Sequence, residues 1–251
     1  GSVSLLTREG EVEIAKRIEH GESSVIENVV NKEVGIQSIL EIGKKLEKNT
    51  YKLRDVIRGL DEEEAETDQT ETFNSLLEIF KSIENFYEDN KKHSAKLKQK
   101  SVTVSLRNKV KTKIHENNKK IFEQVKLINL NKKQISSIVN KFKHYVISID
   151  EIERTLAHSI ELHLTKNKLA INEIVEDVRK NKIKDIKKLE KKFNIPKKHY
   201  DELDKLIKNC QKKLKKISDE VDLPVGEFRN VYIAIKNGEM MAECAKSELV
   251  E

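Results

Sequence analysis

The longest regular pattern in this sequence is a stripe of apolar residues between positions 135 and 160. A helix with such a stripe must have it covered, either by helices of the same chain or by a second copy. The spacing continues over nearly four heptads and is typical of a seam that packs against another helix. Several long helical patterns lie nearby, so we expect an antiparallel bundle within one chain. The stripe alternates steps of three and four residues through Ile135, Ile138, Phe142, Tyr145, Ile149, Ile152 and Leu156.

Helical periodicity also dominates the rest of the chain. Apolar residues recur at three- and four-residue steps over residues 73–87 and again over residues 106–130, where Asn117 and Asn118 interrupt the stripe. The short β-branched stretch 101–105 has no partner run elsewhere, which argues against a sheet. The sequence therefore predicts an all-α fold, a multi-helix bundle with long antiparallel helices and an acidic linker.

Glycine and proline mark the expected ends of helices. Gly21 follows a short amphipathic stretch, and Gly238 interrupts another, so we expect a helix to stop at each glycine. Pro196 and Pro224 each precede a new apolar stripe, which fits a helix that begins at the proline.

The most acidic segment is the expected linker. Residues 61–71 read DEEEAETDQTE, with seven acidic residues, no basic residue and no large apolar one. Such a segment cannot bury enough apolar surface to pack, so we expect a flexible linker. The alternative is that its acidic residues supply a counter-charge for a basic partner. The expected domain ranges are 1–60, this linker, a helical part over 72–222, and a final part over 223–251.

Two blocks of the sequence are strongly basic. Residues 91–133 hold 14 basic and 2 acidic residues, and residues 179–216 hold 16 and 5. Lysine at this density is suited to contacts with phosphates. The alternative is that these blocks are the solvated faces of long helices. Aromatic residues are not interleaved with the lysines, so stacking on single-stranded bases is not indicated.

Catalytic and metal-binding patterns are missing from the sequence. The closest histidines, His158 and His163, are five apart, whereas zinc pairs on a helix are three or four apart. Cys210 and Cys244 are isolated, which suits a reducing compartment. No apolar run approaches the roughly 20 residues of a membrane span, and the N-terminus has no signal-peptide pattern. We expect a cytoplasmic protein that is not an enzyme and uses no cofactor or metal.

The stretch from residue 5 to residue 22, LLTREGEVEIAKRIEHGE, is more informative than the charge and periodicity patterns. Thr7 is a suitable N-cap for a short helix. Glutamates follow it near the positive end of the helix dipole, and Lys16, Arg17 and His20 lie near the negative end. Almost every residue fits the pattern of region 1.2 of the bacterial primary (housekeeping) sigma factors, which the stretch strongly resembles.

A second resemblance lies at the other end of the chain. Residues 223–251 read LPVGEFRNVYIAIKNGEMMAECAKSELVE and resemble the end of the same family's non-conserved region running into region 2.1. Leu249 stands where methionine is usual, and Met241 and Cys244 stand at positions that are usually basic or variable. A weaker resemblance is NIPKKHYDEL, similar to a segment late in that region. The assignment of residues 61–190 to this family rests on their position and helical character alone. The matching residues are Gly238, Glu239, Ala242, Ala245, Lys246, Glu248, Val250 and Glu251.

The resemblance implies a fragment of a sigma-70 family subunit, a transcription initiation factor that directs core RNA polymerase to promoters. It implies core RNA polymerase and promoter DNA as partners of the full-length protein. Region 1.2 of this family lies near the non-template strand downstream of the −10 element. On this basis Leu5, Leu6 and Arg8 are candidate contacts to that strand, with Lys16 and Arg17 as candidate contacts to phosphates.

Alternatives remain open for the whole chain and for two of these residues. The whole chain could instead be a stand-alone helical protein-interaction scaffold that dimerises through the seam at 135–160. Of the two oligomeric states, we expect a monomer. Leu5 and Leu6 have the alternative of packing against the final helix. The order of the two resemblances also predicts a contact between the Ile14/Ile18 face of the first helix and the Ala242/Ala245 face of the last.

Overall fold

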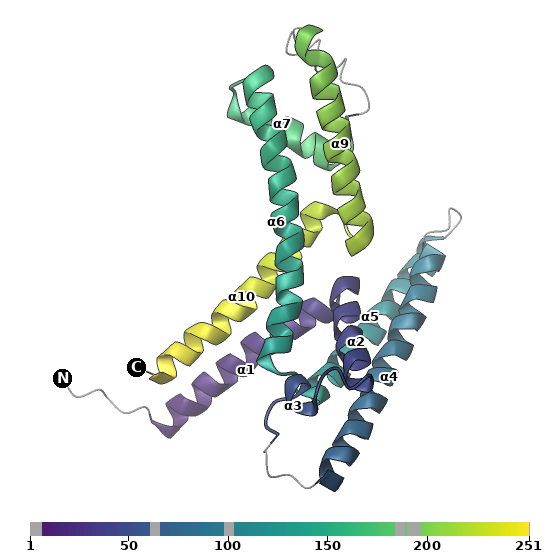
Figure 1. Cartoon of the computed structure of the whole chain (residues 1–251), viewed down its shortest axis with the longest axis vertical. Helices are drawn as coiled ribbons and strands as arrows, with labels where there is room; N and C mark the ends of the chain where they lie inside the picture. The colour runs from purple at the N-terminus through teal and green to yellow at the C-terminus, as the bar shows by residue number, and fades with distance from the viewer. Residues whose placement is uncertain (1–6, 61–65, 98–102, 184–188, 190–196, 251) are drawn as a thin grey trace, which may run out of the picture. The chain divides into compact units, whose positions relative to one another are not determined.

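The computed structural model describes residues 7–60, 66–97, 103–183, 189 and 197–250. Within these ranges the chain forms nine α-helices and no β-strand (Figure 1), which confirms the expected all-α fold. None of these helices is long and apolar enough to span a bilayer. The helices are α1 (Arg8–Val30), α2 (Glu33–Glu47), α3 (Leu53–Val56), α4 (Glu66–Leu97), α5 (Val104–Ile128), α6 (Lys132–His163), α7 (Lys168–Arg179), α9 (Lys197–Val221) and α10 (Val225–Val250).

The chain packs as two compact units. The first contains Gly1–Asn140 and Ile233–Glu251, and the second contains Lys141–Tyr232, so α6 and α10 contribute to both. This division follows packing, whereas the ranges expected from the sequence follow charge and resemblance, and those ranges stay predictions. Helix α4 begins at Glu66, inside the expected linker, and residues 61–65 lie outside the described residues.

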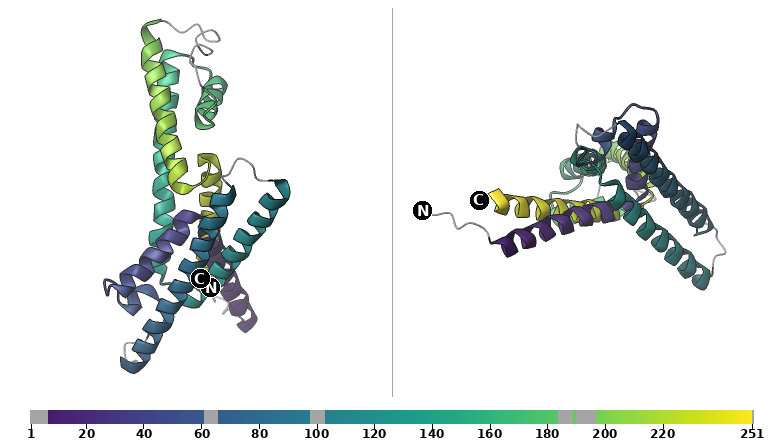
Figure 2. Two further views of the ribbon diagram at one scale, coloured as in Figure 1. Left: turned by 90° about the vertical axis from the view of Figure 1, so that its right-hand side faces the viewer. Right: turned by 90° about the horizontal axis from the view of Figure 1, so that it is seen from below.

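Helices α4 and α5 of the first unit lie side by side in opposite directions (Figures 1 and 2). Two asparagines that interrupt the apolar stripe of α5 bond to α4. The side-chain N–H₂ of Asn117 donates to Asn90 at 3.0 Å and to Asp89 at 2.9 Å, and Asn90 donates to Asn118 at 2.8 Å. Because a buried amide needs hydrogen-bond partners, these contacts fix the register of the two helices.

The second unit covers part of the apolar seam of α6 with the first turns of α10. The ring of Phe142 stacks on that of Phe228, with centroids 5.4 Å apart and planes 3° from parallel. Tyr145 meets the same ring edge-on at 5.8 Å. Further along α6, Ile149 and Leu156 are fully buried. Three seam side chains of this unit, Phe142, Ile149 and Leu156, are therefore buried within one chain, whereas Tyr145 and Ile152 are partly exposed.

The first and last helices of the first unit pack unusually closely. Figures 1 and 2 show α1 and α10 side by side with opposite directions. A Cβ atom added to Gly21 would lie 2.7 Å from the backbone nitrogen of Ala242 and 2.8 Å from the carbonyl oxygen of Gly238. A Cβ atom on Gly238 would lie 2.9 Å from Val25. Ala242 and Ala245 are buried, so the expected pairing of the first helix with this part of the last helix is confirmed.

The expectation that helices end at Gly21 and Gly238 is wrong. Helix α1 continues to Val30, where Asn31 is its C-cap, and α10 passes through Gly238 without a break. Neither glycine has a positive φ angle. Their role is to let two backbones approach, which requires the absence of a side chain but no special dihedral angle.

We predict that Gly21→Ala lowers the melting temperature. Alanine favours a helix over glycine by about 1 kcal/mol, yet the added Cβ would press on backbone atoms, and overpacking costs typically 1–3 kcal/mol. A net loss of up to about 2 kcal/mol is therefore expected in thermal unfolding followed by circular dichroism. Gly226→Ala is the matched control in α10, because its nearest neighbour, Arg179 Cδ, is 3.9 Å away. A Gly21→Ala variant that melts at or above the parent temperature would contradict the close-packing argument.

We also predict that the chain is monomeric. Dimerisation through the seam at 135–160 needs exposed apolar residues, but Ile138, Phe142, Ile149 and Leu156 are 0–4% exposed in one chain. Light scattering at several protein concentrations should give one constant mass near 29.1 kDa. A mass that rises towards the dimer with concentration would favour the scaffold alternative.

Candidate functional site

The five candidate residues fall into three groups. Leu5 and Leu6 lie outside the described residues. Arg8 and Lys16 are exposed and form no ion pair with any described residue. Arg17 is half-buried and bonds to Glu248 of α10. At 100° per residue it lies about 180° around the helix from Arg8. The structure therefore leaves two of the three described candidates open to solvent.

The start of α1 is set by its sequence. The Thr7 hydroxyl accepts a hydrogen bond from the backbone N–H of Gly10 at 3.1 Å, which confirms the expected N-cap. Glu9 and Glu11 occupy the first turn, where negative charge is favoured by the helix dipole. The whole helix carries three basic and six acidic residues, so on its own it attracts phosphates weakly.

Arg17 is held by a bidentate ion pair with Glu248 of α10. The two guanidinium nitrogens donate to the two carboxylate oxygens at 2.6 and 2.8 Å. The hydrogen bonds from Arg17 hold the pKa of Glu248 below its usual range. The two side chains are 41% and 47% exposed, so the pair contributes little to stability. It does occupy the donors that a phosphate contact would need.

Glu22, one turn after the last basic residues of α1, is the centre of a second set of ion pairs. Its carboxylate accepts hydrogen bonds from Arg58 at 2.7 Å and from Lys246 of α10 at 2.8 Å. Burial raises the pKa of Glu22, but the hydrogen bonds from Lys246 and Arg58 outweigh it, and the pKa is lowered. Lys132, at the start of α6, pairs with Glu243 at 2.9 Å in the same area. Four segments distant in sequence meet here.

Backbone pairing places Arg58 for this role. Ile57 and Leu130 form an isolated antiparallel bridge. The backbone N–H of Arg58 donates to Asn129 at 3.0 Å, and its side-chain Nε donates to the carbonyl of Leu130 at 2.9 Å. Asn129 has a φ of 51°, a left-handed conformation that asparagine tolerates better than most residues. The guanidinium is thereby aimed at Glu22.

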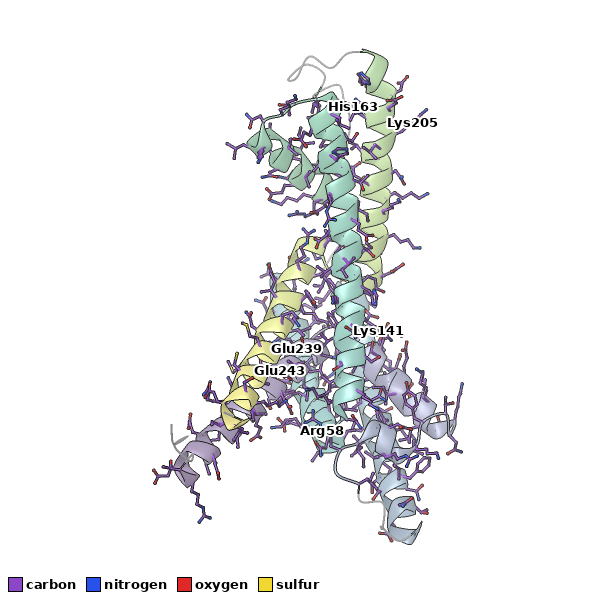
Figure 3. The ribbon with its side chains drawn as sticks, turned by 60° about the vertical axis from the view of Figure 1, so that its left-hand side comes forward. Arg58, Lys141, His163, Lys205, Glu239 and Glu243 are labelled. Carbon is purple, nitrogen blue, oxygen red and sulfur yellow. The ribbon has the colours of Figure 1, made fainter. Side chains whose placement is uncertain are left out.

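These residues border a groove of about 560 Å³ in the first unit. Its apolar lining comes from Val25, Ile135 and Met240, and its charged lining has both signs. Figure 3 labels Arg58, Glu239 and Glu243 in this area. The charged side chains that line it are paired with one another: Lys236 bonds to Glu239 at 2.7 Å, in addition to the ion pairs above.

Most of this network has no local pattern in the sequence. The partners of Glu22 and Arg17 lie 36, 224 and 231 positions away in the chain, and charged residues are too abundant for pairs to be chosen by composition. His163 and His199 of the second unit have ring centroids 4.6 Å apart but lie 36 positions apart in the chain, so they too leave no local pattern. Among the described residues no group of three or more histidine, cysteine, aspartate or glutamate side chains is arranged to hold a metal ion.

Comparison with known protein families adds one finding. Residues 1–24 match the family model for region 1.2 of the sigma-70 factors. The matched range ends just after Glu22 and includes all five candidate residues. It supports a role related to sigma factors in transcription initiation.

We predict that Glu22→Gln destabilises the first unit at neutral pH and reduces its sensitivity to acid. The lowered pKa of Glu22 means that its contribution is complete above the ordinary glutamate pKa of about 4.5 and is lost as the pH falls through the lower folded value. Removing this carboxylate leaves Arg58 and Lys246 without a shared partner, at a cost of about 1–2 kcal/mol.

The measurement is the melting temperature at each half pH unit from 7 to 3. The variant should melt below the parent at pH 7, and the two curves should converge towards pH 3. Glu19→Gln on the exposed side of α1 is the matched control, since Glu19 has no partner among the described residues. Parallel curves for parent and Glu22→Gln at all pH values would contradict the assignment.

Proposed function

We propose that this chain is the part of a primary sigma factor that extends from region 1.2 through the non-conserved region into region 2.1. In this role it belongs to a transcription initiation subunit that joins core RNA polymerase and promoter DNA. The observation that carries the proposal is the match of residues 1–24 to sigma-70 region 1.2. The pairing of α1 with α10 supports it, because the two sequence resemblances lie on those helices.

We assign the DNA-facing role to the exposed side of α1. Arg8 and Lys16 are free of ion pairs with described residues and suit contact with the non-template strand downstream of the −10 element. Leu5 and Leu6 precede the helix and complete the candidate contact. Arg17 contacts a phosphate only when its bond to Glu248 is broken, so we place it behind Arg8 and Lys16 as a candidate contact.

The isolated chain should not bind promoter DNA in a sequence-specific way. The acidic excess of α1 opposes phosphate attraction, which supplies much of the affinity for DNA. A mobility-shift titration at physiological salt should give equal affinity for a promoter duplex and for a scrambled duplex of the same length. A preference of tenfold or more for the promoter would contradict this prediction.

The double substitution Arg8→Ala with Lys16→Ala should slow promoter opening when the sigma subunit that carries this segment is assembled with core RNA polymerase. We expect a loss of about three- to tenfold, because a solvent-exposed charge contact contributes roughly 0.2–1 kcal/mol. The measurement is the rate of open-complex formation on a linear promoter fragment.

The matched control removes the same charge elsewhere in the first unit, by Lys48→Ala with Lys32→Ala. Both variants should bind core RNA polymerase like the parent, so that a change in opening reports on DNA contact. Equal rates for the Arg8/Lys16 variant and the control would remove these two residues from the proposed interface.

A further inference from the structure

A concentrated basic surface that the proposed function does not use lies on the middle of α9. Between residues 205 and 216 this helix holds six lysines and no acidic residue. All six are exposed. They are Lys205, Lys208, Lys212, Lys213, Lys215 and Lys216, which we call the α9 lysine face.

The lysine face exists because α9 is amphipathic. Leu203, Ile207, Cys210 and Leu214 follow one another at steps of three and four and are 2–4% exposed. At 100° per residue, this buried stripe lies on the opposite side of the helix from Lys205. Figure 3 shows Lys205 on the side of α9 that is turned away from α6.

Three of these lysines form a straight row. By the same helical geometry Lys205, Lys212 and Lys216 fall within about 40° of one another, and the row extends over about 17 Å at 1.5 Å per residue. This length matches roughly five base pairs of duplex DNA at 3.4 Å per step. Lys205 and Lys212 form no ion pair with described residues, and Lys216 lies 3.8 Å from Glu220.

The chemistry of the face fits the phosphate backbone of a duplex. Lysine contributes point charges without the fixed fork with which arginine recognises guanine, so the face carries little means of reading sequence. No exposed large apolar residue in the described part of the chain belongs to α9. Binding of a protein partner usually needs such residues at its centre, and stacking on single strands needs aromatic ones.

The other basic helix, α5, has a row of the same length, because Lys109, Lys113 and Lys120 also fall within about 40° of one another. Two of these three lysines are engaged within the chain. Lys113 pairs with Glu116 at 3.3 Å, and Lys120 lies 5.3 Å from the ring centre of Phe86. The difference between the two rows is therefore that two of the three α9 lysines, Lys205 and Lys212, form no ion pair with described residues, whereas two of the three α5 lysines are engaged.

We propose that the α9 lysine face binds the phosphate backbone of duplex DNA without sequence preference. This contact is separate from the one assigned to α1, and it requires neither the sigma role nor a promoter sequence. It attracts DNA through counterion release, so its affinity falls steeply as salt rises.

The test uses the whole chain and a fluorescently labelled 20-base-pair duplex of scrambled sequence. Anisotropy titrations between 50 and 200 mM salt give the slope of log affinity against log salt. The variant Lys205→Gln/Lys212→Gln/Lys216→Gln should bind at least tenfold more weakly at 50 mM salt. Its slope should be shallower by about 2–3, since each phosphate contact contributes roughly 0.9.

Two controls isolate the cause. Lys109→Gln/Lys111→Gln/Lys119→Gln removes the same charge from exposed sites spread around α5 and should lower affinity less than threefold. The triple Lys→Arg variant of the α9 row keeps its charge and should retain the parent slope, whereas loss of the slope in it would overturn the proposal. Circular dichroism of every variant checks that the helices are intact.

Three other results would overturn the proposal. These are the absence of duplex binding by the parent at 50 mM salt, equal weakening by the α5 and α9 glutamine variants, and displacement of the duplex by polyglutamate at equal charge concentration. The last result would identify acidic protein as the better partner. A failure here leaves the assignment of α1 unchanged, since that rests on promoter opening by the holoenzyme.

Discussion

The first unit depends on the close approach of α1 to α10. Gly21 and Gly238 have no side chains, so the two backbones pack at distances that a single Cβ would disturb. This approach brings Glu22 within 2.8 Å of Lys246 and Arg17 within 2.6 Å of Glu248. The ion pairs by themselves are partly exposed and weak. They follow from the backbone packing, which therefore sets the position of the segment that matches region 1.2.

The same packing decides which residues of α1 are available to a ligand. One side of the helix is committed to α10, and Arg8 and Lys16 are left on solvent-facing sides. Six acidic residues against three basic ones make this helix a poor source of affinity for DNA. An element that positions specific contacts can do so with little net attraction when other surfaces supply the backbone contacts. The aligned lysines of α9 have the charge and geometry for that second role.

Sequence periodicity predicted the helical class and the buried part of the α6 seam, and the order of the two family resemblances predicted the pairing of the first and last helices. It failed where one residue type serves two purposes. Glycine ends helices and also permits close packing, and at Gly21 and Gly238 only the tertiary neighbour decides between them. Asn117 interrupts an apolar stripe in the sequence, yet in the fold it is a buried, hydrogen-bonded contact to α4. Ion pairs between residues more than 200 positions apart leave no local pattern.

Arg17 shows how the fold and the proposed interface are coupled. Its pairing with Glu248 satisfies the guanidinium. A phosphate that replaced the Glu248 carboxylate would leave that carboxylate without its bidentate donor. Because both side chains are more than 40% exposed, water would solvate the released carboxylate, and the exchange would cost little. The anchoring of α1 does not require this pair, since Gly21, Gly238 and the Glu22 network remain. Arg17 can therefore exchange partners while the helix keeps its place, whereas Glu22 cannot.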